Sequence, residues 1–215
     1  MMENVTKPHN LAAVARTADA IGLLDIHAIT DRKSIKLTSM SASGVKKWIS
    51  VHTHPDTTTG INHLKQQGMQ ILSTCLNPDA IDYREADYTK PSAIIMGTEL
   101  EGTSDLAIEM SDTHIFIPMA GLVQSLNVSV ASALILYEAY RQRTDAGMYD
   151  TRRLEDARYF KLLFEWCHPK VARYCKQKKI PYPEINEHAE ILEPVADSST
   201  HSDETFSHWI KSKKT

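Results

Sequence analysis

Cysteine is scarce in this sequence, and its scarcity excludes two classes of protein. Three cysteines stand among 215 residues, an odd number and too few for a disulfide framework. Their positions, Cys75, Cys167 and Cys175, match no common spacing of zinc ligands, because no second pair accompanies them. We therefore expect buried thiols, with neither a disulfide scaffold nor a metal centre.

Long apolar runs are also missing. The longest candidate, residues 117–139, is interrupted by Ser125 and Asn127, so no run reaches the roughly 18 apolar residues that a membrane-spanning helix needs. The opening MMENVTKPHN holds no hydrophobic signal-peptide core. With an ordinary hydrophobic content of 42%, these absences predict a cytoplasmic globular protein without a membrane segment.

The glycine-rich loops that hold nucleotide phosphates are absent too. The sequence contains no GxGxxG, and no Gly-Lys-Ser/Thr follows a predicted strand. This argues against a generic nucleotide-binding α/β domain. No internal repeat is visible, and 215 residues suffice for one domain with a sizeable core and an appended piece.

Charge is distributed unevenly along the chain, although the total is only −3. Residues 1–140 hold ten Lys/Arg and fifteen Asp/Glu, residues 141–180 hold eleven and five, and residues 181–215 hold three and seven. The middle segment therefore carries +6, between segments of −5 and −4. It forms either solvated helices or a surface that faces phosphate groups, and charge alone leaves both open.

Strand-like and helix-like patterns alternate along the chain. Short apolar runs predict strands at residues 25–30, 48–54, 69–75, 92–97 and 114–118. Helical spacing of apolar residues predicts helices after Asn10 as N-cap and up to Gly22, and at 56–67, 104–110 and 126–144. This alternation indicates an α/β domain with a mostly parallel sheet, in which ligands bind at the carboxyl ends of the strands.

One stretch that could carry chemistry is NLAAVART, near the start of the chain. Asn10 and Arg16 are six residues apart, which is about 600° of helical turn and places their side chains roughly 120° apart. A helix cap followed by a surface arginine is the simpler explanation of this pair.

Two further stretches follow predicted strands. In IIMGTELEGTSD, a strand ends at Gly97, and Glu99 stands between that residue and Gly102. In IPMAGLVQSLN, Ser125 and Asn127 stand at the start of an uncharged helix. A tight connection and a helix cap would explain these features singly, but the order of all three stretches and their places at strand ends favour a shared site.

Taken in order, the three stretches resemble the motifs of the SpoU class of RNA ribose 2′-O-methyltransferases, within the SPOUT superfamily. NLAAVARTADAIG is similar to the first motif, IIMGTELEGTSD to the second and IPMAGLVQSLNVSVASALILYEA to the third. The resemblance covers about residues 4–190. Beyond residue 140, RQRTDAGMY and PYPEIN resemble the C-terminal extension of the TrmH type, whose members modify guanosine 18 in the D-loop of tRNA.

The resemblance implies an α/β fold in which the C-terminal part forms a deep trefoil knot, a topology that general rules of chain connection disfavour. It also implies that S-adenosylmethionine, the methyl donor, binds in the knot through backbone groups of three loops. Carried over residue by residue, those loops contain Thr74, Gly97, Ile117 and Leu126. A hydrophobic slot with backbone donors suits an adenosyl group better than salt bridges would.

The implied reaction is methyl transfer to a ribose 2′-hydroxyl, a poor nucleophile until it is polarised or deprotonated. The resemblance assigns this activation to Arg16, with Asn10 orienting Arg16 or the substrate. Because a guanidinium pKa exceeds ~12, one reconciliation has Arg16 hold the substrate phosphate and stabilise the forming alkoxide. Phosphate or water would then take the proton. Glu99, Ser125 and Asn127 are expected to line the methyl-transfer pocket.

Members of the family are homodimers in which the arginine of one subunit faces the cofactor of the other, and we expect the same here. Related tRNA enzymes carry an N-terminal helical extension before the first motif. Either such an extension is missing from this chain, or tRNA binding rests on its C-terminal part. The candidates for that contact are Arg141, Arg143, Arg152, Arg153, Arg158, Lys161 and Arg173. Phosphate contacts of this kind would make the affinity fall steeply with salt.

These expectations divide the chain into three parts. Residues 1–144 would form the knotted methyltransferase domain, residues 145–192 a basic helical extension that contacts tRNA, and residues 193–215 a polar, mobile tail. Guanosine 18 of tRNA is the preferred target. The alternatives are the same chemistry on another tRNA or rRNA nucleotide, and a non-catalytic RNA-binding protein that retains the knot. A pure binder has no evident need for all five proposed catalytic residues.

Overall fold

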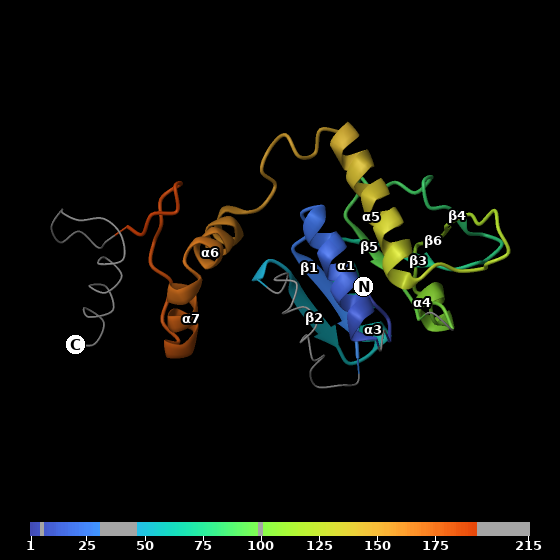
Figure 1. The fold of residues 1–215 in the computed structure, drawn as a ribbon, viewed down its shortest axis with the longest axis horizontal. Helices are drawn as coiled ribbons and strands as arrows, with labels where there is room; N and C mark the ends of the chain where they lie inside the picture. Colours follow the sequence, from blue (N-terminus) through green and yellow to red (C-terminus); the bar gives the residue numbers. More distant parts are fainter. Residues whose placement is uncertain (5–6, 31–46, 99–100, 193–215) are drawn as a thin grey trace. The chain divides into compact units, whose positions relative to one another are not determined.

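The computed structural model describes residues 1–4, 7–30, 47–98 and 101–192. The chain divides into two units, Met1–Thr151 and Arg152–Thr215, which are treated one at a time (Figure 1). Glu99 and the predicted tail at 193–215 lie outside the described residues.

The first unit alternates strands with helices, as the sequence predicts. Its elements in chain order are α1 (Pro8–Ala20), β1 (Asp25–Ile29), β2 (Ser50–His54), α3 (Thr57–Gln66), β3 (Gln70–Thr74), β4 (Ile81–Asp82), β5 (Ser92–Ile95), α4 (Asp105–Glu109), β6 (Thr113–Phe116) and α5 (Val128–Asp145). All pairings between these strands are parallel. The expected α/β class is therefore confirmed, and only the two-residue β4 has no counterpart among the predicted strands.

The strands form one pair, β1–β2, and one four-stranded sheet in the order β4-β6-β3-β5. The first three residues join the two. The Met2 N–H donates to the His27 carbonyl at 2.8 Å, and the Ile29 N–H donates to the Met2 carbonyl at 2.8 Å. On the other side, the Glu3 N–H donates to the Met96 carbonyl at 2.8 Å. The chain start therefore lies between β1 and the end of β5 like a short strand.

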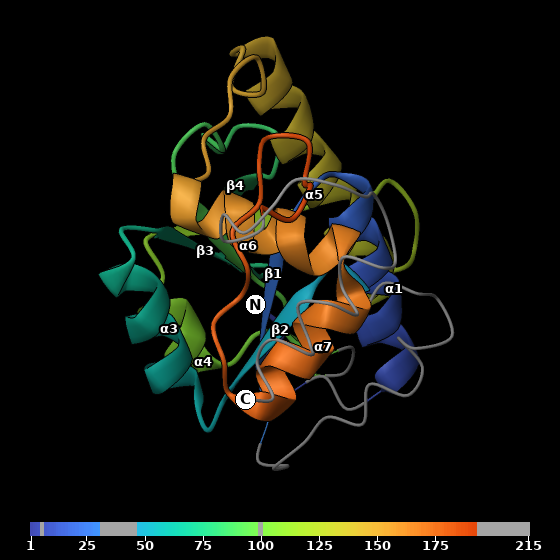
Figure 2. The same cartoon turned by 90° about the vertical axis from the view of Figure 1, so that its left-hand side faces the viewer.

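Helices cover both faces of this sheet, and the burial pattern of β3 shows the division. Leu72 belongs to a core that includes residues of α1 and α5, whereas the adjacent Ile71 belongs to a second core that includes residues of α3 and α4. Successive side chains of a strand point to opposite faces, so both faces of β3 are buried. In Figure 2, α3 and α4 lie on one side of the strands and α1 and α5 on the other.

The start of α1 corrects one sequence prediction. Asn10 is not the N-cap, because the helix begins at Pro8 and Lys7 precedes it as N-cap without a capping side-chain bond. Proline is well suited to the first helical position, since its fixed φ matches a helix and its missing N–H would have no partner there. Asn10 therefore lies inside the first turn, where only 3% of it is exposed. Gly22, at φ +76°, follows the helix end as predicted.

The other predicted helix caps are confirmed. The Ser104 hydroxyl accepts from the Ala107 N–H at 3.2 Å at the start of α4. The Asn127 side chain accepts from the Ser129 N–H at 2.9 Å at the start of α5, so this helix begins two residues later than its apolar run suggested. Both caps satisfy N–H groups that a helix start leaves unpaired.

The second unit contains α6 (Asp156–Cys167) and α7 (Pro169–Lys178). Its small core consists of Phe164, Val171, Ala172 and Cys175, against which Ile180, Tyr182, Ile185 and Ile191 pack. The cysteines are all free, and Cys167 is exposed, so the expectation that every thiol is buried is wrong for that residue. None of the described helices is long and apolar enough to cross a membrane.

Candidate functional site

The first and third motifs meet where α1 packs against α5. The Asn127 amide Nδ2 donates to the Asn10 Oδ1 at 3.4 Å, which links residues 117 positions apart. The Asn127 Oδ1 also accepts from the Ser129 N–H at 2.9 Å and from the Ser129 hydroxyl at 2.6 Å. Asn127 therefore caps α5 and also contacts Asn10 of α1, while its expected place in a methyl-transfer pocket stays a prediction.

Arg16 lies apart from this pair. It is exposed on α1, and no hydrogen bond or ion pair joins its guanidinium to another of the described residues. The six-residue separation from the buried Asn10 accounts for the difference, because the two side chains leave the helix in different directions. Within one chain, the structure does not bring Arg16 and Asn10 together.

The second motif forms a closed turn at Gly97. The Thr98 N–H donates to the Gly102 carbonyl at 2.9 Å, and the Gly102 N–H donates to the Thr98 carbonyl at 3.1 Å. A Cβ on Gly97 would lie 2.0 Å from the Gly102 carbonyl carbon and oxygen, so no other residue fits. Gly102 itself adopts φ +71°. Both glycines are therefore required by the shape of the turn.

Thr74 connects the end of β3 to this turn. Its hydroxyl donates to the Ile95 carbonyl at 3.0 Å, and the Thr103 hydroxyl donates to the Thr74 carbonyl at 2.8 Å. Because β6, β3 and β5 are parallel neighbours, the segments that follow them leave the same edge of the sheet. The predicted cofactor loops after β3, β5 and β6 therefore share that edge.

The segment after β6 presents apolar side chains without charge. Ile117 packs against the first core, while Leu126 is partly buried and Ser125 is exposed. Leu122 and Val123 are among the most exposed large hydrophobic residues, at 103% and 64%. Apart from His114, residues 113–130 contain no acidic or basic side chain. Such a surface can receive an apolar group and offers its main-chain amides as donors.

A buried carboxylate near this edge was missed by sequence reasoning. Glu3 is 2% exposed. Its Oε1 accepts from the Thr57 hydroxyl at 2.5 Å and the Ser104 hydroxyl at 2.7 Å, and its Oε2 accepts from the Ser104 N–H at 2.9 Å. The sequence signals Ser104 as a cap, but no local pattern points from there to a residue 101 positions earlier.

A histidine cluster on β1, β2 and α3 was also missed. His27 and His52 are register partners on adjacent strands, with ring centroids 4.9 Å apart. The His27 Nδ1 lies 2.9 Å from the His54 Nε2, and His63 of α3 lies beside both rings. Burial, followed by nearby positive charge, lowers the pKa of His27 to about 4. Within the described parts of the chain, no group of His, Cys, Asp or Glu is arranged to hold a metal ion.

Two of the predicted RNA contacts are engaged within the first unit. Arg141 pairs with Glu138 at 2.8 Å and with Asp145 at 2.6 Å, and the Glu138 carboxylate raises the pKa of the guanidinium. Arg143 donates to the main-chain carbonyls of residues 88 and 90 at 2.8 and 3.1 Å. These contacts give both arginines a structural role near the end of α5.

The other predicted RNA contacts belong to the second unit. Arg152 pairs with Asp156, and its guanidinium lies 4.2 Å from the centre of the Tyr159 ring. The remaining four are exposed on or beside α6 and α7, and they are Arg153, Arg158, Lys161 and Arg173. Residues 152–192 hold nine lysines and arginines and six acidic residues, which gives a net charge of +3.

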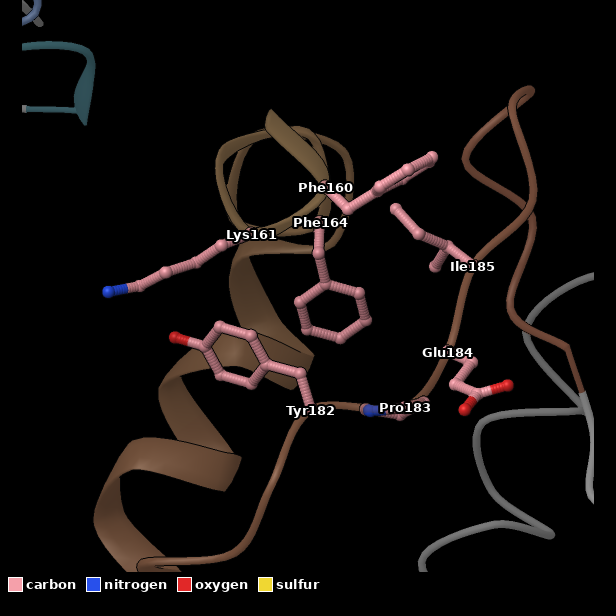
Figure 3. A pocket seen from close by; sticks show the side chains of 7 residues that line it. All are labelled: Phe160, Lys161, Phe164, Tyr182, Pro183, Glu184 and Ile185. Atoms are coloured by element: carbon pink, nitrogen blue, oxygen red, sulfur yellow. The ribbon is translucent and has the colours of Figure 1, made fainter. Parts of the chain in front are cut away.

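An aromatic groove lies beside Lys161 in this unit (Figure 3). Its volume is about 370 Å³, and its lining comes from α6 and the segment after α7, namely Phe160, Lys161, Phe164, Tyr182, Pro183, Glu184 and Ile185. The rings of Phe164 and Tyr182 are stacked with centroids 4.7 Å apart. The Tyr182 hydroxyl donates to Glu165 at 2.8 Å, which fixes that wall of the groove.

Comparison with known proteins identifies the family. The protein-family model described as "SpoU rRNA Methylase family" matches residues 1–137 of the sequence. A second family model, described as "SpoU, rRNA methylase, C-terminal", matches residues 141–194. The chain therefore belongs to the SpoU methylase family, and the resemblance drawn from the three motifs is confirmed.

Individual relatives agree with this assignment. The chain is 48% identical over 192 residues to the tRNA (guanosine(18)-2′-O)-methyltransferase of Escherichia coli K12, covering 88% of this chain and 84% of that protein. It is similar to the solved structure of the TrmH/SpoU tRNA modifying enzyme of A. aeolicus, with a TM-score of 0.72, 37% identity and coverage of 79% and 87%. A structure of AdoMet-bound rRNA methyltransferase from Sinorhizobium meliloti matches with a TM-score of 0.58, 31% identity and coverage of 65% and 54%.

Proposed function

We propose that this chain transfers the methyl group of S-adenosylmethionine to the ribose 2′-hydroxyl of guanosine 18 in tRNA. The observation that carries the proposal is the contact between Asn10 and Asn127, because Asn127 ends the segment after β6, one of the three segments that leave the same edge of the sheet. Relatives named for this reaction cover most of the chain, which supports the choice of substrate. A tRNA substrate also implies that the protein works in the cytoplasm.

The chemistry of the loops fits the cofactor. Residues 117–130 are free of acidic and basic side chains and expose Leu122 and Val123, which suits an adenosyl group. Main-chain groups at Thr74, Gly97, Ile117 and Leu126 would hold it. When bound, S-adenosylmethionine supplies an electrophilic methyl group on a sulfonium.

The protein's own groups must then prepare the ribose hydroxyl. Arg16 is exposed and so can reach an external substrate, and its guanidinium would hold a substrate phosphate and stabilise the forming alkoxide. Its high pKa makes it a donor rather than a base, so phosphate or water takes the proton. Asn10 and Asn127 would orient the reacting groups, with Ser125 in the same pocket, and Glu99, which lies outside the described residues, keeps its expected role as a proposal.

A homodimer would complete this site. The face of α5 that includes Val130, Leu134 and Tyr137 is 39–51% exposed, and together with Tyr83 it borders a hollow of about 430 Å³. An apolar helix face of this kind suits a two-fold interface. Arg16 points away from Asn10 in its own chain, and a site shared between subunits would place it at the partner's cofactor.

The basic second unit is the proposed tRNA contact. Its net charge of +3 in the described residues favours phosphate, and the aromatic groove beside Lys161 offers ring faces on which an unstacked base can lie. The trefoil knot belongs to the same proposal. The structural similarity to a TrmH/SpoU enzyme supports it.

Methyl transfer from labelled cofactor to tRNA transcripts tests the function. A transcript with guanosine at position 18 should be labelled, and one with that guanosine replaced should not. Equal labelling of both would reject the site, whereas labelling of neither, with transfer to rRNA, would favour the alternative substrate.

A further inference from the structure

The Glu3 carboxylate joins three parts of the first unit that are far apart in sequence. It comes from the segment between β1 and β5, and it accepts bonds from Thr57 at the start of α3 and from Ser104 at the start of α4. At 2% exposure, water cannot replace these bonds. If the carboxylate were lost, the Thr57 hydroxyl would be left buried and the two donors of the half-buried Ser104 would lose their partner, which is costly.

The Ser104 side of this network leads directly to the second-motif turn. Ser104 follows Thr103, whose hydroxyl bonds the Thr74 carbonyl at 2.8 Å. The main chain at Gly102 and Thr103 also packs against Gly97, leaving no room for a Cβ. Glu3 therefore holds Ser104, the N-cap of α4. Ser104 directly follows Thr103, which bonds to Thr74 at the end of β3.

We propose that Glu3 is a positioning residue for cofactor binding, and that its carboxylate fixes the main chain at Gly102–Ser104 against Gly97, in the arrangement that receives S-adenosylmethionine. The inference rests on the proposed function, because it assigns the turn to the cofactor. Binding through main-chain amides requires the backbone itself to be preformed, since no side chain can adjust to compensate. A second anchor beside the Thr103–Thr74 bond meets that requirement.

The network offers a matched pair of variants. Glu3→Gln keeps the size of the side chain but turns one oxygen into an amide donor, which must face a hydroxyl or the Ser104 N–H. Thr57→Val removes a bond to the same carboxylate on the α3 side and leaves both bonds to Ser104 in place. A role in general stability would make the two variants similar, whereas a positioning role separates them.

Calorimetric binding of S-adenosylmethionine and steady-state kinetics with tRNA provide the test, with circular dichroism to verify folding. For Glu3→Gln, we expect the Kd and the KM for the cofactor to rise about tenfold, because about this much is expected from the loss of one hydrogen bond to a carboxylate. The KM for tRNA should stay unchanged. For Thr57→Val, we expect a lower melting temperature and an unchanged cofactor Kd. Ser104→Ala should weaken cofactor binding in the same direction as Glu3→Gln, and the double variant should lose less than the sum.

An unchanged cofactor Kd in Glu3→Gln, or an equal rise in Thr57→Val, would overturn the proposal. If Glu3→Gln fails to fold, Ser104→Ala decides alone by the same measurement. Failure of the proposed function is distinguishable, because the wild-type protein would then bind S-adenosylmethionine without methylating the guanosine-18 transcript.

Discussion

Acidification is expected to destabilise the first unit, because it would charge a histidine that the fold keeps neutral. The pKa of His27 is lowered from 6.5 to about 4, first by burial and then by the amino group of Met1 and the histidines at positions 52, 54 and 63. The pKa of His54 is lowered as well, again chiefly by burial. The rings of His52, His54 and His63 all lie beside His27, so positive charge on them opposes a proton on His27.

The sign and the size follow from proton linkage. A base with a lowered pKa binds fewer protons in the folded chain, so its contribution is complete above pH 6.5 and is lost as the pH falls toward 4. The difference between 6.5 and about 4, at ~1.4 kcal/mol for each pH unit, sets a ceiling of about 3 kcal/mol. His27 is only partly buried, and solvent screening reduces the expected loss to about 1–2 kcal/mol.

Urea unfolding at a series of pH values from about 7.5 to 4.5 measures this loss directly. His27→Gln should flatten the dependence of the unfolding free energy on pH, because glutamine has no group that binds a proton in this pH range. His188→Gln is the matched control, because that side chain is 75% exposed and belongs to the second unit. Identical pH slopes for the wild type and His27→Gln, or equal flattening by the control, would refute the reasoning.

Three further predictions concern the proposed activity. Arg16→Ala should lower kcat by at least about a hundredfold with an unchanged melting temperature, because the exposed guanidinium stabilises charge only during the reaction; near-normal turnover would remove its assigned role. Leu134→Arg should convert a dimer to a monomer in sedimentation velocity and abolish methyl transfer, whereas a wild-type monomer would contradict the shared site. Phe160→Ala combined with Lys161→Ala should weaken tRNA binding about tenfold and make it less dependent on salt, with cofactor binding unchanged; an unaltered salt slope would exclude Lys161 as a phosphate contact.

Local patterns were sufficient to predict most of the fold. The helix caps at Ser104 and Asn127 and the helix end at Gly22 all depend on residues within four positions of each other, and the structure contains each of them. Asn10 was misjudged because its amide is a good cap in isolation, whereas Pro8 starts the helix two residues earlier. The two-residue β4 has too few residues to show a period.

Contacts between distant residues could not be read in this way. The structural role of Glu3 depends on its hydrogen bonds to Ser104, 101 positions away. The lowered pKa of His27 depends on burial and on residues of other elements that pack beside it. Arg141 shows the converse, since a basic residue that suggests a phosphate contact is already paired with its own helix. The contact between Asn10 of the first motif and Asn127 of the third could not be predicted from local patterns, because nothing in the spacing of the motifs specifies the α1–α5 packing.

The pairing of the chain start with both sheets has a consequence for folding. The Met96 N–H donates to the Met1 carbonyl across 95 positions, and the Ile29 N–H donates to the Met2 carbonyl on the other side. The bond to Met96 cannot form before the two halves of the unit have come together, so this short segment would complete its pairing late, after the slow closure of a long loop. The amide proton of Met96 should then exchange with solvent only when the whole unit opens, which would make it a reporter of the unit's cooperativity.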